Sequence, residues 1–524
     1  MPENMLTTAR QQARARACEP AFVTPDRTWT FDDIDRASNR AARGLRSLGI
    51  GHGDRVACLT KHTAECMVVL LAAQKVGAVC MPVNWRLAAP EIEYIVGNGD
   101  AKLLMVDAAF VPLARAASMP TLRLTVATDA PADGLPALLD WAAAFEETDP
   151  GFEPSPGDTA LQLYSSGTTG LPKGVELSHA NLATAMVDVV PPSIGYHGPP
   201  QVMLNVLPTF HIAGIGIAMC TYCAGGKSVL FPDFDPPRVL DAIPQHRITH
   251  SFLVPAMIQF LLQVPGADSR DYSSLEFISY GASPITERVL LDALRTFKCG
   301  FIQVYGLTET TGAITGLPAE DHQAEGPKAV LLRSAGKPLI GVELKVVDAA
   351  TGREMPEGEV GEVWIRSRQN MKGYWRNPKA TEAAFSERQP DGLGWFRSGD
   401  AGYLRDGYLF LHDRIKDMII SGGENIYPAE VENVLMKHPA VADGAVIGVP
   451  DPKWGDAVKA CVVLKPGVQA SEPEIIGYMR ERLAHYKCPK TVDFMDAIPR
   501  NPSGKILKRV LREPFWQGRE RPIG

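Results

Sequence analysis

Apolar residues in the first hundred positions alternate between helical and extended spacing. Ile34, Ala37 and Ala41 keep a helical interval. Thr30 before them is a typical N-cap, and Gly49 after them is a typical C-terminal stop. Strands are predicted at 55–59, 78–83 and 102–106, and further helices at 64–76 and 90–96. This alternation predicts a mostly parallel sheet covered by helices.

The middle of the chain continues the strand pattern after an interruption. Between residues 118 and 156, Ala, Pro and Asp predominate, and we expect an irregular connection. Strands are then predicted at 202–206, 250–254, 275–279 and 301–304. Because carboxyl ends of strands line the ligand crevice of open α/β sheets, the segments that follow should form its walls. These segments are Pro208 to Gly214, Tyr280 to Pro284, where Ser283 and Pro284 should begin a helix, and Tyr305 to Thr310.

The last third of the chain changes character. Short strands with Gly and Pro turns predict a β subdomain between Gly341 and Tyr408. After a charged joint at 413–417, helical and extended runs predict a compact α+β unit. The predicted fold is therefore α/β, with a large N-terminal domain at 1–415 that includes the β subdomain. A small, mobile α+β C-terminal domain is predicted at 416–524, with the boundary near Lys416.

Composition narrows the class of protein. With 45% hydrophobic and 22% charged residues in 524, the chain is globular and long enough for several domains. A net charge of −7 argues against a nucleic-acid partner. The nine cysteines lack zinc spacing, so we expect reduced thiols and a cytoplasmic location. The longest apolar runs, Met67 to Ala73 and Ile212 to Met219, predict no integral membrane segment.

The stretch from Tyr164 to Val175 concentrates phosphate-handling chemistry. It contains hydroxyl side chains, three glycines and Lys173, so its backbone N–H groups can surround an anion. It is not a Walker A loop, because Lys173 stands three residues after Gly170. A flexible surface loop is the alternative interpretation, but the preceding predicted strand and a helix predicted from Leu177 argue against it.

This stretch closely resembles the phosphate loop of the adenylate-forming superfamily, which includes acyl-CoA synthetases, luciferases and adenylation domains. Four further motifs occur in the order typical of that superfamily. Tyr305 to Thr310 resembles its adenine and magnesium segment, and Asp400 with Arg414 resembles its ribose-binding pair. Gly422, Gly423 and Glu424 resemble the loop along the CoA path, and Lys505 resembles the C-terminal catalytic lysine. In addition, Lys416 matches the hinge position of the superfamily.

The resemblance implies a set of site residues and cofactors. Lys505, Thr168, Lys173 and Glu309 are the implied catalytic residues, and Glu309 and Thr168 are the implied Mg²⁺ ligands. ATP and AMP would be bound by Ser165, Ser166, Gly167, Thr168, Thr169, Gly170, Lys173, Gly281, Ala282, Ser283, Tyr305, Gly306, Thr308, Asp400 and Arg414. ATP, Mg²⁺ and coenzyme A as co-substrate are therefore expected.

The implied acid pocket has an uncharged lining. Its predicted residues are His211, Ile212, Ala213, Gly216, Tyr280, Gly281, Ala282 and Gly306. Amino-acid-activating members of the superfamily carry an aspartate where this chain has His211, so an amino-acid substrate is disfavoured. A hydrophobic monocarboxylic acid, either fatty or aryl, is expected. The alternative is that His211 is a structural histidine with satisfied hydrogen bonds, and the two interpretations have nearly even weight.

Three functions remain to be compared. The favoured one is an ATP-dependent acid:CoA ligase of small-molecule carboxylic acids, with a homodimer left open. The second is an adenylate-forming enzyme with another acceptor, such as a carrier protein or oxygen, although the chain has no room after Lys505 for a fused carrier domain. The third is a catalytically silent nucleotide-binding protein, which should lack one of Lys173, Glu309, Asp400 or Lys505; all four are present.

Overall fold

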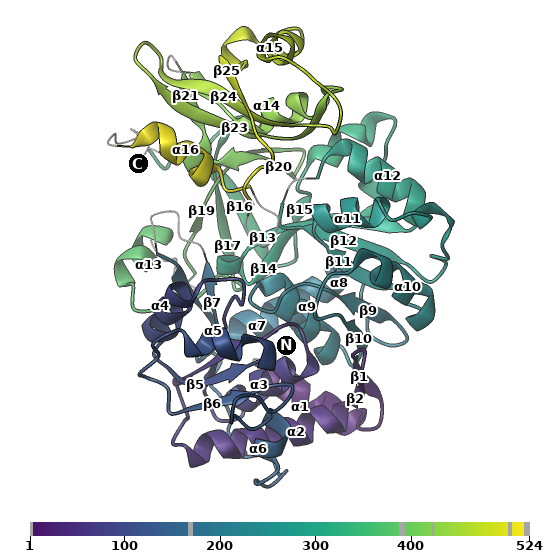
Figure 1. Ribbon diagram of the computed structural model, residues 1–524, viewed down its shortest axis with the longest axis vertical. Helices are drawn as coiled ribbons and strands as arrows, with labels where there is room; N and C mark the ends of the chain where they lie inside the picture. The colour runs from purple at the N-terminus through teal and green to yellow at the C-terminus, as the bar shows by residue number, and fades with distance from the viewer. Residues whose placement is uncertain are drawn as a thin grey trace.

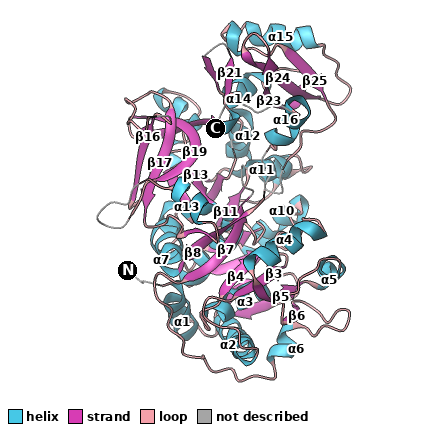
Figure 2. Cartoon of the chain, turned by 90° about the vertical axis from the view of Figure 1, so that its left-hand side faces the viewer, coloured by secondary structure: helices cyan, strands magenta, loops and turns pink. Residues whose placement is uncertain are grey.

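The chain forms a large N-terminal part and a smaller C-terminal part, which Figure 1 places at the top. A computed structural model describes residues 4–165, 171–283, 285–349, 351–386, 393–421, 424–500 and 506–517. Within those ranges the strands assemble into four sheets, against which the helices pack (Figure 2). No helix in these ranges is long and apolar enough to cross a membrane.

One sheet of the N-terminal part is built from the predicted βα units. Its strands are, in spatial order, β18 (Gly373–Tyr374), β8 (Lys173–Ser178), β7 (Thr159–Ser165), β4 (Val79–Pro82), β3 (Arg55–Leu59), β5 (Ala101–Val106) and β6 (Leu124–Ala127). The strands from β7 to β6 run parallel, whereas β8 and β18 are antiparallel to their neighbours. The predicted parallel arrangement is thus confirmed.

A second, larger sheet carries the predicted crevice. Its strands are, in spatial order, β15 (Lys337–Pro338), β14 (Gly312–Leu317), β13 (Gly300–Leu307), β12 (Phe277–Gly281), β11 (His250–Leu253), β9 (Val202–Asn205), β10 (Lys227–Leu230), β1 (Pro20–Val23) and β2 (Thr28–Thr30). From β13 to β1 the neighbours are parallel. The carboxyl ends of β13, β12, β11 and β9 therefore meet at one edge.

Helices cover both sheets of the N-terminal part. They are α1 (Met5–Ala15), α2 (Phe31–Ser47), α3 (Ala64–Gln74), α4 (Ala89–Gly99), α5 (Val111–Arg115), α6 (Leu138–Ala142), α7 (His179–Ala183), α8 (Val190–Ser193), α9 (Ile212–Cys223), α10 (Pro236–His246), α11 (Pro255–Leu262), α12 (Glu287–Phe297) and α13 (Pro378–Ala384). Thr30 caps α2 through a reciprocal pair with Asp33, as its sequence predicts.

The largest core lies between the two sheets. It takes Val56 and Cys58 from one sheet and Met203 and Ile302 from the other, with α3 buried between them. A second core fills the opposite face of the larger sheet beneath α10, α11 and α12. Because the sheets share one core, the site at the carboxyl edge rests on a rigid base.

Two more sheets complete the chain. An antiparallel sheet contains β16 (Val342–Val347), β17 (Gly361–Ser367), β19 (Phe396–Arg405) and β20 (Tyr408–Arg414), as the β-subdomain prediction requires. The C-terminal sheet contains β22 (Glu424–Ile426), β21 (Ile419–Ser421), β24 (Gly455–Leu464), β23 (Val441–Asp451) and β25 (Thr491–Phe494). Helices α14 (Pro428–Leu435), α15 (Glu472–Arg480) and α16 (Lys508–Trp516) accompany it.

The segment after the phosphate loop differs from its prediction. We predicted a helix from Leu177, but residues 173–178 form β8, paired antiparallel with β7, and α7 begins only at His179. Val175 and Leu177 are buried, whereas Glu176 between them accepts a hydrogen bond from Arg55 at 2.9 Å. That two-residue alternation is the period of a strand, so the predicted helix was wrong.

Two other expectations need correction. The connection at 118–156 is not irregular throughout, because β6 extends the first sheet and α6 packs beneath it. The helix predicted to begin at Ser283 begins at Glu287 instead, and Pro284 lies outside the described residues. Thr286 is its cap, since its hydroxyl accepts from the Val289 N–H group.

Candidate functional site

The two strands that flank the phosphate loop form an antiparallel pair. Ser165, at the end of β7, lies directly opposite Lys173, at the start of β8. The Lys173 Nζ atom lies 5.1 Å from the centre of the Tyr374 ring. The other predicted loop residues, Ser166, Gly167, Thr168, Thr169 and Gly170, lie outside the described residues. The hairpin thus brings one hydroxyl and one ammonium group to the base of the loop.

The Glu309 carboxylate connects three segments of the site. Its Oε1 atom accepts hydrogen bonds from the Ser165 hydroxyl at 3.2 Å and from the Tyr374 hydroxyl at 3.1 Å. Its backbone carbonyl accepts from the Met371 N–H group at 2.7 Å. Glu309 stands in a short helical turn, Thr308–Thr310, directly after β13. The structure therefore joins the predicted magnesium residue to the base of the phosphate loop.

Tyr374 is a candidate site residue that the sequence analysis missed. It lies on β18, far from Glu309 in sequence, and no motif considered above includes it. The signal is a tyrosine in the run Met371 to Trp375, which becomes informative only once β18 is seen to pair with β8. Its hydroxyl holds Glu309 while its ring faces Lys173.

Tyr305 and Asp400 form a second contact between distant segments. The Tyr305 hydroxyl donates a hydrogen bond of 2.6 Å to Asp400 Oδ2, and Asp400 is 8% exposed. Arg414 lies opposite Asp400 in the ladder between β19 and β20, although its side chain is not described. The pair joins the larger sheet to the antiparallel sheet, which places the predicted adenine and ribose residues side by side.

The segment after β12 runs beside the segment after β13. Gly281 is the neighbour of Val304 in the sheet, and a Cβ atom at Gly281 would lie 2.3 Å from the Val304 carbonyl oxygen. A Cβ atom at Gly306 would lie 1.8 Å from the Gly312 carbonyl oxygen. Both glycines are therefore required by close backbone approach. Ala282 has a φ of +67°, an unusual conformation for alanine that turns the chain toward Ser283.

His211 lies half-buried at the N-cap of α9. Burial lowers the pKa of His211 to about 4, and the nearby Arg86 charge adds to this effect. The imidazole is therefore neutral near pH 7. Its Nε2 atom is buried and has no hydrogen-bond partner among the described residues. An unpartnered buried nitrogen argues against the structural alternative for His211, because structural histidines are normally satisfied.

The predicted acid-pocket residues divide between two faces of the larger sheet. Ile212 and Ala213 pack against the core between the sheets, together with Met186. Gly216 is also on this side, because a Cβ atom there would lie 2.9 Å from the Met186 Cε atom. Tyr280 belongs to the core on the opposite face, where its hydroxyl lies 3.0 Å from His322 Nε2. The structure thus does not bring Tyr280 to the wall formed by α9.

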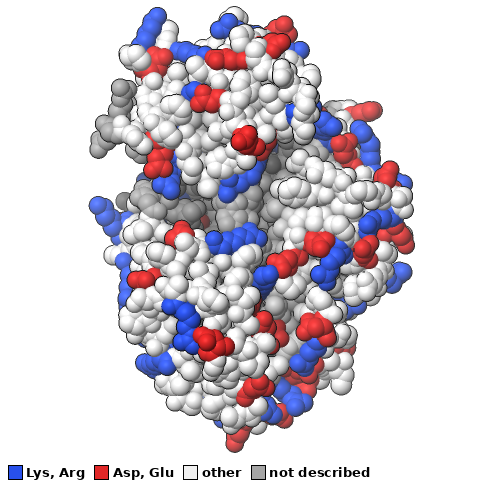
Figure 3. All heavy atoms as spheres, viewed as in Figure 1, with Lys and Arg blue, Asp and Glu red and all other residues white. Residues whose placement is uncertain are grey.

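The C-terminal part contributes residues whose description is incomplete. Lys505, Gly422 and Gly423 lie outside the described residues, and so does the side chain of Lys416. Glu424 is exposed at the start of β22 and pairs with Ser421. Figure 3 shows a hollow between the C-terminal part and the rest of the molecule, with basic side chains on both sides. An anionic ligand would therefore be attracted to this hollow.

The family of the chain follows from its sequence matches. Residues 9–375 match the AMP-binding enzyme family, and residues 430–505 match the AMP-binding enzyme C-terminal domain. The first match alone covers more than half of the chain. The chain therefore belongs to the AMP-binding enzyme family, which confirms the predicted resemblance.

Relatives with different acceptors and acids match almost the whole chain. A fatty acid–[acyl-carrier-protein] ligase, ScoC of Streptomyces coeruleorubidus, is 38% identical and covers 99% of this chain and 98% of its own. The long-chain-fatty-acid–CoA ligase FadD13 of Mycobacterium tuberculosis is 38% identical, with 97% of each chain covered. A feruloyl-CoA synthase of an Amycolatopsis species is 38% identical, with 93% and 94% covered.

A solved structure resembles the whole arrangement of the chain. ATP-bound MatB from Rhodopseudomonas palustris superposes with a TM-score of 0.88 at 30% identity, covering 98% of this chain and 99% of that one. The apo form of the same protein gives 0.77 over the same shares. The chain therefore superposes better on the ATP-bound form than on the apo form.

Proposed function

We propose that this chain is an ATP-dependent acid:CoA ligase that converts a hydrophobic monocarboxylic acid into its CoA thioester through an acyl-adenylate. The observation that carries the proposal is the convergence at the end of β13. There, Glu309 contacts Ser165 and Tyr374, while Tyr305 contacts Asp400. The groups proposed to face phosphate, metal and ribose thus lie at one edge in a member of the AMP-binding enzyme family.

The first step joins two anions. A carboxylate oxygen of the acid attacks the α-phosphorus of ATP, the bond from that phosphorus to the bridging oxygen breaks, and pyrophosphate leaves. The repulsion must be offset by positive groups held in place. Lys173, fixed over the Tyr374 ring, and Lys505, assigned by its motif, supply those charges. Asp400, with its hydroxyl partner Tyr305, positions the nucleoside by accepting the ribose hydroxyls.

The donor set fits a magnesium ion that is bound mainly by substrate phosphates. Among the described residues, no cluster of three His, Cys, Asp or Glu side chains could hold a metal alone. Mg²⁺ is commonly bound by one or two carboxylates together with phosphate oxygens, and Glu309 provides one such carboxylate. The described contacts occupy its Oε1 atom. Glu309, with Thr168 of the loop, would hold the ion, whose positive charge neutralises the phosphates.

The second step transfers the acyl group to sulfur. The CoA thiolate attacks the carbonyl carbon of the acyl-adenylate, the bond to the phosphate oxygen breaks, and AMP leaves. In the proposed cycle the C-terminal domain rotates near Lys416, so that Lys505 leaves and Gly422, Gly423 and Glu424 line the CoA path. The likeness to an ATP-bound arrangement supports the first position of this cycle.

The acid is proposed to be a neutral one with a hydrophobic tail. Ile212, Ala213 and Gly216 present small, uncharged surface on the α9 side. His211 is neutral and has a free nitrogen among the described residues, so it can bind a polar group of the acid without attracting a second carboxylate. Relatives that act on fatty acids and on ferulate support both a fatty and an aryl acid.

A panel of acids incubated with ATP and Mg²⁺, with and without CoA, tests the proposal. We expect pyrophosphate release that depends on the acid, and acyl-CoA only when CoA is present. The Glu309→Gln variant should lose both products, because it removes the charge at the end of β13. ATP hydrolysis that is independent of every acid would contradict the proposed function.

A carrier protein is the second candidate acceptor. The observation that favours it is the ScoC match, since that relative is a ligase for an acyl-carrier protein and covers nearly the whole chain. The two acceptors differ beyond the pantetheine arm, because CoA ends in a nucleotide and a carrier protein presents a folded surface. Competition between CoA and a phosphopantetheinylated carrier protein for the same acyl-adenylate therefore distinguishes them.

A further inference from the structure

Met186 lies between the proposed acid pocket and a cavity at the surface. On the inner side, a Cβ atom at Gly216 would meet Met186 Cε at 2.9 Å, and one at Gly312 would meet it at 3.7 Å. Gly312 begins β14, three residues after Glu309. The end of the Met186 side chain therefore reaches the site itself, although Met186 is only 2% exposed.

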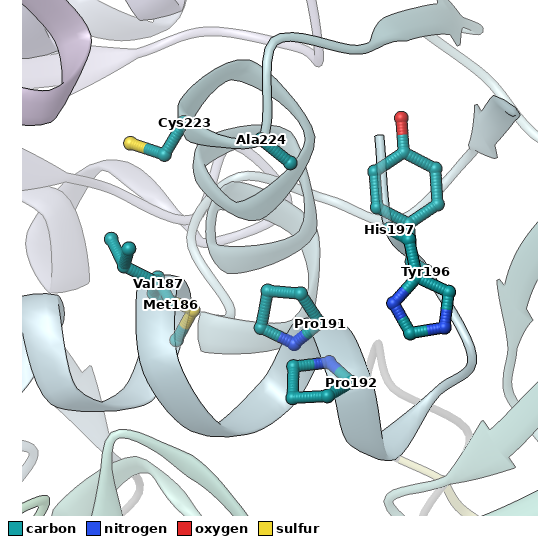
Figure 4. A pocket seen from close by; sticks show the side chains of 8 residues that line it. All are labelled: Met186, Val187, Pro191, Pro192, Tyr196, His197, Cys223 and Ala224. Carbon is teal, nitrogen blue, oxygen red and sulfur yellow. The ribbon is translucent and has the colours of Figure 1, made fainter. Parts of the chain in front are cut away.

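On the outer side, Met186 lines a cavity of about 230 Å³. The other lining residues are Val187, Pro191, Pro192, Tyr196, His197, Cys223 and Ala224. Figure 4 shows the two prolines and Met186 on one helical segment, facing the end of α9 that carries Cys223 and Ala224. No Lys, Arg, Asp or Glu is among these lining residues, so the cavity suits an uncharged ligand.

One face of α9 connects the two spaces. Gly216 and Cys220 of α9, and its C-cap residue Ala224, follow at intervals of four, so they lie one above another on the side that faces Met186. The Cys220 Sγ atom lies 3.4 Å from Met186 Sδ, between the two ends. Eight residues of helix correspond to about 12 Å. Met186 and Cys220 therefore separate Gly216 from the cavity at Ala224.

The backbone that carries Met186 is irregular. Residues Thr184–Val189 form a π-helical turn (η2) between α7 and α8. Pro191 and Pro192 follow it, and because proline has no N–H group, the carbonyls one turn earlier lose their regular partners. Such turns occur often at functional sites. Methionine is unbranched and has several rotatable bonds, so its side chain can turn aside at small cost.

We propose that Met186 sets the acyl-chain length accepted by the enzyme, by closing the inner end of the acid pocket against the surface cavity. Acids that end before Met186 bind with its side chain in place. A longer acyl chain turns the side chain aside and runs along α9, so that its distal methylenes occupy the cavity of Figure 4. This inference rests on the proposed function, because it assigns a size limit to the same acid pocket.

Truncation of Met186 gives the direct test. The kcat/KM values for acid-dependent AMP formation are measured with saturated acids of increasing length, for wild type and Met186→Ala. The kcat/KM values for shorter acids should change little in the Met186→Ala variant. For longer acids, each methylene newly buried past position 186 should raise kcat/KM about fourfold, which corresponds to its transfer free energy. The matched control is Met67→Ala, which truncates an equally buried methionine of α3 and should keep the wild-type profile.

A bulky residue in the outer cavity tests the path independently. Ala224 lines the cavity and is partly exposed, so the Ala224→Trp variant should fold. Its kcat/KM values for the longest acids should be lower than those of wild type. Combined with Met186→Ala, it should abolish the gain for long acids. A gain that persists in the double variant would overturn the path.

An unchanged chain-length profile in a folded Met186→Ala enzyme would overturn the gate while leaving the proposed function intact. If wild type forms no AMP with any acid, both the gate and the proposed function fail.

Discussion

At the scale of single residues, hydrogen bonds fix the position of Asp400. It is nearly buried, accepts the Tyr305 hydroxyl at 2.6 Å, and its N–H group donates to the Ser398 hydroxyl at 3.0 Å. Such a carboxylate has one fixed orientation, so in the proposed site a ribose would find its acceptor already placed. Binding then costs little side-chain entropy.

Asp400→Ala is expected to weaken ATP binding strongly. Two charge-assisted hydrogen bonds contribute about 1.5 to 3 kcal/mol each, so the Kd should rise at least about a hundredfold. Titration calorimetry with ATP measures this change. Asp406→Ala, which removes an exposed turn carboxylate, should bind ATP like wild type. A wild-type Kd for the Asp400 variant would remove this residue from the nucleotide site.

The buried imidazole of His62 is expected to lower the stability of the protein as the pH falls from 7 to 5. Burial lowers its pKa to about 4, and its Nδ1 atom lies 2.7 Å from the Leu207 carbonyl oxygen. In the unfolded chain the imidazole takes a proton near pH 6.5, but in the folded chain only near pH 4. Since the unfolded state binds the extra proton, His62 should cost about 2 kcal/mol of stability between pH 7 and pH 5.

Chemical denaturation of wild type and His62→Gln at these two pH values measures the effect. The variant should start from a lower stability but lose less of it on acidification. His211, with its pKa also near 4, contributes in the same direction, whereas burial raises the pKa of Asp107 to about 6 and acts in the opposite direction. Equal losses in wild type and variant would mean that His62 is already protonated in the fold.

At the scale of elements, two glycines of the α9 region face different neighbours. A Cβ atom at Gly214 would lie 2.1 Å from the Pro208 carbonyl oxygen, which belongs to the backbone. At Gly216 it would lie 2.9 Å from the movable end of Met186. The Pro208 backbone cannot move without disturbing the loop that precedes α9, whereas the end of the Met186 side chain can change its rotamer. The same Gly→Ala substitution should therefore have different consequences at positions 214 and 216.

Gly214→Ala is expected to lower the melting temperature by several degrees, because overpacking costs about 1 to 3 kcal/mol. Gly216→Ala should melt near the wild-type temperature but shift acid preference toward shorter acids. Thermal unfolding and the acid panel, applied to both variants, separate the two effects. A large loss of stability in Gly216→Ala with an unchanged acid profile would contradict this assignment.

The elements also show where sequence reasoning succeeds. Capping residues and helical spacing predicted α2 correctly, and buried apolar runs predicted β3, β4 and β5, because each signal is local. The strand β8 was mistaken for a helix, because its six residues precede α7 without a break and a short apolar run fits either period. Tertiary pairing with β7 decided the outcome.

The same limit applies to the site. Motifs identified Glu309, Tyr305 and Asp400 as candidates, and the structure brings all three to the end of β13. Tyr374 was not identified, since its role depends on β18 lying beside β8. The misplaced residue was Tyr280, because strand neighbours point to opposite faces and its sequence position alone does not say which face holds the acid. Sequence motifs therefore identify chemistry, and pairing decides which side chains meet.

At the scale of the whole molecule, an ion pair ties the C-terminal helix to the joint between the parts. Arg512 of α16 contacts Asp417 at 2.7 Å, and both side chains are largely buried. Asp417 ends the short turn Ile415–Asp417 that follows the antiparallel sheet. This contact therefore holds α16 against the joint at 413–417.

The predicted rotation of the C-terminal domain gives Lys505 a role in only the first of the two half-reactions. Lys505→Ala should abolish acyl-adenylate formation, because the lysine offsets the repulsion between the acid and the α-phosphate only in the first arrangement. Thioester formation from a supplied acyl-adenylate should be largely retained, since Lys505 has left the site by then. Single-turnover assays of each half-reaction measure this split. Lys437→Ala, which removes a basic side chain next to α14, is the matched control and should retain both rates. Equal losses in the two half-reactions of Lys505→Ala would mean that one arrangement serves both steps, and that the joint at Asp417 does not need to move.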